Sequence, residues 1–80
     1  MKEDQAHMTM RYDQLMTLFG KNLRSIRYDS LGLTQKELSG LTGVSASTIS
    51  LLEQGVIGCT VKTLHALCDA CGADVTTMLK

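Results

Sequence analysis

Apolar residues recur every three or four positions near the start of the chain, which is the spacing of one helix face. This run predicts a helix from about Met10 to Tyr28, with Thr9 as its N-cap. Its inward positions are Leu15, Phe19, Leu23 and Ile26. Residues 1–9 are polar and lack periodicity, so we predict a flexible N-terminal segment followed by one domain over residues 10–80. The fringe methionines Met8, Met10 and Met16 suit core packing or a dimer contact better than a cofactor role.

The stretch from 33 to 55 predicts two short helices joined by a tight turn. Thr34 and Glu37 have the spacing of a capping box, which marks the start of the first helix. Gly43 stands where this helix should stop, because glycine enters a left-handed C-cap without steric cost. Ser45 then offers a side-chain oxygen to cap the second helix.

The second of these helices has two different faces. Ile49 and Leu52 lie three residues apart and form an inward stripe. The outward positions are Ala46, Ser47, Ser50, Leu51 and Gln54. An outward face on a short helix after a glycine turn is the layout of a DNA-reading helix-turn-helix.

The remaining chain predicts two more helices, which makes the fold all-α with five helices. Thr60 caps a fourth helix that Gly72 ends, and Asp74 caps a short fifth helix. The expected core positions of these helices are Leu64, Leu67, Cys68, Cys71, Val75, Met78 and Leu79.

The amino-acid composition limits the classes of protein to which the chain can belong. Eighty residues without proline, 44% of them hydrophobic, favour one small helical domain. No apolar run approaches the roughly 20 residues of a membrane span. The polar start MKEDQ does not resemble a signal peptide, so we expect a cytoplasmic protein whose three cysteines are reduced.

The net charge is zero, and Lys and Arg are missing from Gly43 to Val61. Non-specific DNA affinity comes from Lys and Arg on phosphates. A local basic patch must therefore supply the affinity, or DNA is not the partner.

Five segments between Phe19 and Leu79 carry a family resemblance: FGKNLRSIR, LTQKEL, GVSASTIS, LLEQG and TLHALCDACGADVTTML. They resemble the Cro/repressor-type (lambda-repressor-like) helix-turn-helix family. The resemblance implies a five-helix domain that binds double-stranded DNA as a homodimer. It also implies a pseudo-palindromic operator, with the helix at residues 45–54 in the major groove.

Carried over by position, the resemblance implies base contacts from Ala46, Ser47, Ser50 and Leu51. It implies phosphate contacts from Gln35, Lys36, the Gln54 main chain, Lys21 and Arg24. The alternative for Lys21, Arg24, Lys36 and Gln35 is an ordinary solvated surface. The family also pairs an arginine with a glutamate at the end of the third helix, here Arg27 with Glu53. The run YDSLGL after Arg27 is one residue longer than the family's usual turn.

One departure from the family supports a second hypothesis. Leu41, Leu51, Val56 and Ile57 are apolar where the fold predicts exposure. Because such patches mark partner surfaces, the alternative is a protein-interaction module, antitoxin-like or a co-regulator, with weak DNA affinity.

Two other functions, zinc binding and enzymatic catalysis, are not favoured by the sequence. His65, Cys68 and Cys71, with Cys59 nearby, include zinc-ligand types, but buried core thiols explain the spacing better. No nucleophile stands with a positioned base, and no glycine-rich phosphate loop is present. We therefore expect no metal, no cofactor and no enzymatic activity.

Overall fold

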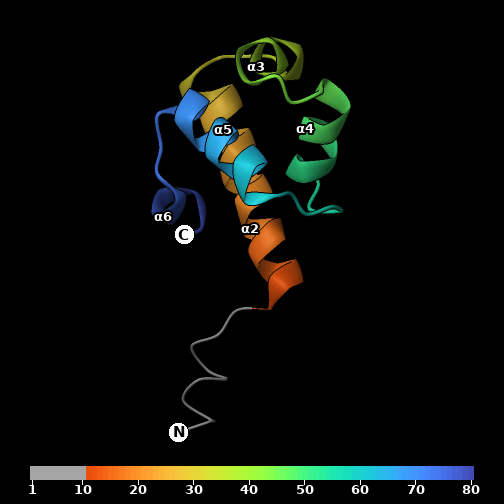
Figure 1. Cartoon of the computed structure of the whole chain (residues 1–80). Coiled ribbons are helices and arrows are strands. Elements are labelled where there is room, and N and C mark those ends of the chain that lie inside the picture. The colour runs from red at the N-terminus through yellow and green to blue at the C-terminus, as the bar shows by residue number, and fades with distance from the viewer. Residues whose placement is uncertain (1–10) are drawn as a thin grey trace, which may run out of the picture.

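A computed structural model describes residues 11–80, and over this range the chain is all-helical (Figure 1). The elements are α2 (Tyr12–Arg24), η1 (Ser25–Ser30), α3 (Gln35–Thr42), α4 (Ala46–Glu53), α5 (Val61–Cys71) and α6 (Val75–Met78). If α2 and η1 are counted as one continuous helix, the described residues form the five predicted helices. The predicted flexible segment, Thr9 as a cap, and the methionines Met8 and Met10 lie outside the described range.

The first helix begins and ends differently from the prediction. It starts at Tyr12 after Arg11, and its α-helical part stops at Arg24 instead of continuing to Tyr28. The chain then continues as a π-helix, in which the Leu31 N–H donates to the Ile26 carbonyl at 2.9 Å. A π-turn holds one more residue than an α-turn. The π-turn overlaps the start of the run YDSLGL and holds one residue more than an α-turn would there.

The predicted ends of the two short helices are confirmed. The Glu37 N–H donates to Thr34 Oγ1 at 3.0 Å, and the Thr34 N–H donates to Glu37 Oε1 at 2.8 Å. Gly43 follows α3 with φ of 77°, in the left-handed region that favours glycine. Ser45 Oγ accepts from the Thr48 N–H at 3.1 Å and caps α4. These local bonds fix where the turn between α3 and α4 begins and ends.

The last two helices also start at their predicted caps. Thr60 Oγ1 accepts from the Thr63 N–H at the start of α5, and Asp74 Oδ1 accepts from the Thr77 N–H at the start of α6. Asn22 Nδ2 donates to the Met78 carbonyl at 2.8 Å, which ties α6 to α2. No helix over residues 11–80 has the length and hydropathy to cross a membrane.

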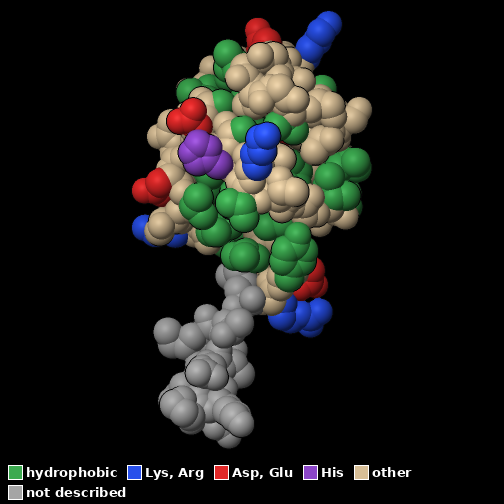
Figure 2. All heavy atoms as spheres, viewed as in Figure 1, with side chains coloured by type: hydrophobic (Ala, Val, Ile, Leu, Met, Phe, Trp, Pro, Cys, Tyr) green, Lys and Arg blue, Asp and Glu red, His purple; other side chains and the backbone are tan. Residues whose placement is uncertain are grey.

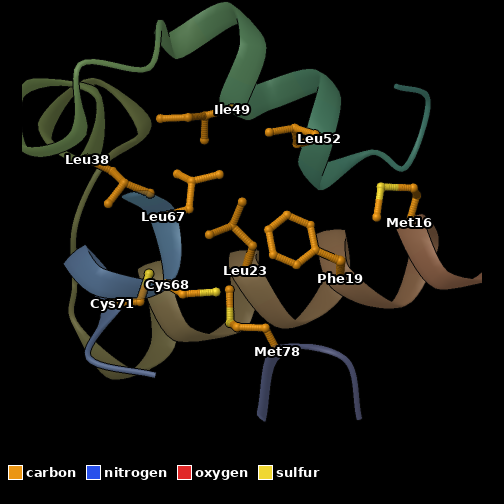
Figure 3. Close-up of a cluster of buried hydrophobic side chains, with 10 residues drawn as sticks. All are labelled: Met16, Phe19, Leu23, Leu38, Ile49, Leu52, Leu67, Cys68, Cys71 and Met78. Atoms are coloured by element: carbon orange, nitrogen blue, oxygen red, sulfur yellow. The ribbon is translucent and has the colours of Figure 1, made fainter. Parts of the chain in front are cut away.

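One core lies between the helices (Figure 3). Its buried residues are Met16, Phe19, Leu23, Leu38, Ile49, Leu52, Leu67, Cys68, Cys71 and Met78. Met16 is buried in this core, in agreement with the core packing predicted as one of its two alternatives. Two expectations were wrong. Leu15, predicted as an inward position, is only half-buried. Val75, at the start of the four-residue helix α6, is exposed, whereas Met78 at its end is buried in the core.

Gly20 brings α2 and α4 together. It is buried in the middle of α2, opposite the C-terminal end of α4. A Cβ at this position would overlap the Leu52 carbonyl oxygen and lie 3.0 Å from the Glu53 carbonyl oxygen. The two backbones can approach this closely only because residue 20 has no side chain. The position of the second helix of the turn therefore depends on Gly20.

Candidate nucleic-acid interface

The outward face of α4 is neutral and partly open to solvent. Ser47 and Leu51 are exposed, while Ala46 and Ser50 are half-buried. These four side chains and Gln35 from α3 line one shallow hollow of about 430 Å³. The structure thus brings together all four residues for which base contacts were predicted, and adds Gln35 to them.

An ion pair holds the end of α4. Arg27 Nε donates to Glu53 Oε2 at 2.6 Å, and Arg27 Nη2 donates to Glu53 Oε1 at 2.9 Å. Only 7% of the Arg27 side chain and 4% of the Glu53 side chain are exposed. Arg27 Nη1 also donates to the Leu33 carbonyl at 2.7 Å, so the guanidinium joins three segments. The pair expected from the resemblance is present, in the bidentate geometry that suits arginine and a carboxylate.

The electrostatics of this pair keep Arg27 charged. The hydrogen bond to Glu53 raises the pKa of Arg27 above its ordinary value, and this effect outweighs the opposing cost of burial. A charge this deeply buried is tolerated because it is paired and hydrogen-bonded.

Gln35 has a second, internal contact that the sequence did not reveal. Its Nε2 donates to Glu53 Oε1 at 3.0 Å, although the two residues are 18 positions apart. The first residue of α3 is thus bonded to the last residue of α4. Local periodicity cannot predict a contact of this range, because it depends on how the two helices cross.

The predicted phosphate-contacting cations Lys21, Arg24 and Lys36 are all exposed. Arg24 and Gln35 line one groove of about 410 Å³, whereas Lys21 borders a different hollow beside Asp13. Blue and red side chains are scattered over the face drawn in Figure 2, with no basic patch there.

Gln54 was expected to use its main chain. It follows α4 directly and is exposed, and its Nε2 donates to Ser50 Oγ at 3.0 Å. One lone pair of the Ser50 hydroxyl is therefore occupied, while its O–H remains a donor.

The apolar surface proposed for binding a protein partner is only partly exposed. Leu41 is 65% exposed and Val56 is 61% exposed. Ile57 was expected on the surface, but it is half-buried and packs against the core. Ile57 lies in the loop that follows α4 and covers part of the core.

The cysteines lie in apolar surroundings. Cys68 and Cys71 are buried core residues, Cys59 packs against the core, and His65 is exposed. Burial raises the pKa of all three thiols above its ordinary value. Within residues 11–80, no three His, Cys, Asp or Glu side chains are arranged to hold a metal ion.

Comparison with known families assigns the fold. The family model of the helix-turn-helix domain matches residues 18–79, which is most of the chain. No curated protein sequence matches the chain significantly. The matched region contains α3, the turn at Gly43, and α4 with its outward face. The chain therefore belongs to the helix-turn-helix domain family.

Proposed function

We propose that this protein is a sequence-specific DNA-binding transcriptional regulator of the Cro/repressor type, as in phage, prophage or plasmid control. It acts in the cytoplasm as a homodimer on a pseudo-palindromic operator, with α4 in the major groove of each half-site. The observation that carries this proposal is the hollow formed by Gln35 and the outward residues of α4. It lies on a helix whose two ends are held by Ser45 and by the Arg27–Glu53 pair.

The chemistry of this face suits base edges. Ser47 and Ser50 can donate to or accept from several bases, whereas Ala46 and Leu51 can pack on a thymine methyl group. All four side chains are uncharged, so they contribute specificity more than affinity.

Affinity comes from the surrounding groups. Phosphate contacts fall to Lys21, Arg24 and Lys36, aided by the Gln54 main chain and the positive N-terminal end of α3. If each of these three cations neutralised one phosphate per protomer, the salt slope for a dimer would be about −5. This slope is modest and agrees with the zero net charge of the chain.

Replacing Lys36 or Arg24 by Ala is expected to weaken binding about equally on all duplexes. Each change should lower the salt slope by about one per protomer, because one phosphate contact is lost. Replacing Ser47 by Ala should instead relax preference at one or two base pairs and leave the slope unchanged. Fluorescence anisotropy over a salt series measures both effects, and Lys80→Ala is the matched cationic control. Unaltered affinity in the Lys36, Arg24 and Ser47 variants would contradict the DNA-reading model.

A second function is supported by the exposure of Leu41 and Val56. The alternative is a protein-interaction module, antitoxin-like or a co-regulator, which uses these apolar side chains and Leu51 against a protein partner. The two functions differ in what Leu51 contacts.

Replacing Leu51 by Ala separates the two functions. In a DNA reader the change should cost about 1 kcal/mol on sites with a facing thymine, because methyl packing is lost. In an interaction module it should weaken a protein complex and leave DNA binding unaltered. Anisotropy with duplexes and pull-down of partner proteins, both done with the same variant, give opposite results under the two models.

Selection of bound sequences from a random duplex pool at low salt tests the proposed function directly. A palindromic motif with half-site centres one helical turn apart is expected from a dimer. A pool without an enriched motif, together with binding independent of salt, would reject it.

A further inference from the structure

Apolar side chains gather over the start of α2 and the start of α5 (Figure 2). Tyr12 is 65% exposed, and Val61 is 80% exposed, the highest fraction among the exposed large hydrophobic residues of the described range. Ile57 and Cys59, in the loop that leads to α5, are half-buried and pack against the core. We call these four residues the α2–α5 patch.

Two glycines hold the loop of this patch against α2. A Cβ on Gly58 would overlap the Tyr12 hydroxyl oxygen, so the tyrosine side chain lies directly against the loop between Ile57 and Cys59. A Cβ on Gly55, where φ is 76°, would lie 3.2 Å from the Thr17 Cα. The patch is therefore one surface built from two distant segments, and its shape is set before any partner binds.

The patch carries no charge and lies apart from the outward face of α4. From Gln54 to Val61 the chain has no Lys, Arg, Asp or Glu. Single exposed apolar residues are ordinary, but a cluster of them without charges at its centre is typical of a protein interface. None of the four patch residues lines the hollow formed by Gln35 and α4. A partner on the patch need not cover that hollow.

Opposite charges flank the patch. Asp13 follows Tyr12 in α2, Lys62 follows Val61 in α5, and both are exposed. In a two-fold interface every contact occurs twice with the roles exchanged. If Tyr12 of one copy packs on Val61 of the other, Asp13 and Lys62 can therefore meet at two places. The contact of Asp13 with Arg11, at 3.3 Å, is exposed and weak enough to be shared. This arrangement is complementary to a second copy of itself.

We propose that the α2–α5 patch joins two copies of this chain, with Tyr12 of each copy packed on Val61 of the other. The proposal rests on the proposed function, which requires a dimer, and deepens it by naming the surface between the protomers. Because the loop of the patch follows α4 directly, the same contact sets the distance between the two α4 helices. This distance decides which half-site spacing the dimer can bind.

Replacing Val61 by Asp tests the interface without disturbing the fold. Val61 is the exposed first residue of α5, and an acidic side chain in the first turn of a helix is favourable. In the dimer, the change would bury two carboxylates without partners. The dimer dissociation constant should therefore rise by about a hundredfold or more. Sedimentation equilibrium of the full chain measures this constant, and circular dichroism checks that the variant is folded.

Val75→Asp is the matched control. Val75 is also an exposed valine at the first position of a helix, but it belongs to α6 and lies outside the patch. The change is chemically identical to Val61→Asp and should leave the dimer dissociation constant unchanged.

Charge reversal tests the proposed pairing of the two copies. Asp13→Lys and Lys62→Asp should each weaken dimerisation about tenfold, because like charges then meet at two places. The double reversal restores opposite charges and should return the dissociation constant to that of the wild type. If each change acted only on its own helix, the two losses would add instead.

Sequence selection connects the interface with the operator. Val61→Asp is expected to enrich a single half-site without a fixed spacing to a second one. The wild type and Val75→Asp should enrich the same palindrome.

The outcomes separate this inference from the function on which it rests. A wild type that stays monomeric up to its solubility limit would overturn the inference, and so would a dimer that survives Val61→Asp. Charge reversals whose losses add would overturn the pairing of Tyr12 with Val61. In each case a motif enriched by the wild type would leave the proposed function standing. A wild type that enriches no motif would overturn the proposed function, while loss of the dimer in Val61→Asp but not in Val75→Asp would still support the interface.

Discussion

Replacing Glu53 by Ala is expected to lower the free energy of unfolding by about 3–5 kcal/mol. The change leaves the Arg27 guanidinium buried and unpaired, because only 7% of its side chain is exposed. It also removes the partner of Gln35 Nε2. Denaturant melts followed by circular dichroism measure the effect. In a domain of this size, 1 kcal/mol corresponds to about 4–8 °C in Tm, so the variant should be largely unfolded at temperatures where the wild type is stable.

Two controls separate the buried charge from the loss of a carboxylate in general. Glu37→Ala removes an exposed carboxylate from the capping box at the start of α3 and should cost only about 1 kcal/mol. The double change Arg27→Met with Glu53→Leu should recover much of the lost stability, because apolar pairs often replace buried ion pairs without cost. A melt of Glu53→Ala within a degree or two of the wild type would show that the pair does not hold α4.

Replacing Gly20 by Ala is expected to destabilise the domain by about 3 kcal/mol, at the upper end of the range for overpacking. The new methyl group would overlap the main chain at Leu52 and lie 3.0 Å from the Glu53 carbonyl oxygen. A backbone neighbour cannot rotate away as a side chain can, so α2 and α4 would have to separate. We therefore expect a lower Tm, and also weaker DNA binding because α4 is displaced. Thermal melts and anisotropy on the same samples measure the two effects.

Gly40→Ala is the matched control for this change. Gly40 also lies inside a helix, but it is exposed, and a Cβ there would meet no atom within 4 Å. Alanine should therefore stabilise α3 by about 0.5–1 kcal/mol, the ordinary helix preference over glycine. The two substitutions are identical in chemistry and are expected to have opposite signs. A stabilising effect of Gly20→Ala would mean that the two helices are not in close contact.

The local chemistry of the sequence determined the helices and most of their ends. Thr34, Gly43 and Ser45 mark the turn because each acts through a hydrogen bond or a backbone angle within three or four residues of itself. The outward face of α4 could also be predicted, since a 3.6-residue period assigns each side chain to a face. The Arg27–Glu53 pair is different, because only the family resemblance indicated it.

The tertiary structure alone decided how these elements meet. Periodicity assigns positions to a helix face, but it cannot say how far the buried face extends or what covers it, so Leu15, Ile57 and Val75 were misplaced. The close approach at Gly20 and the bond from Gln35 to Glu53 depend on how α2, α3 and α4 cross. Such contacts join residues far apart in the chain, and their geometry is set by the packing of the whole core.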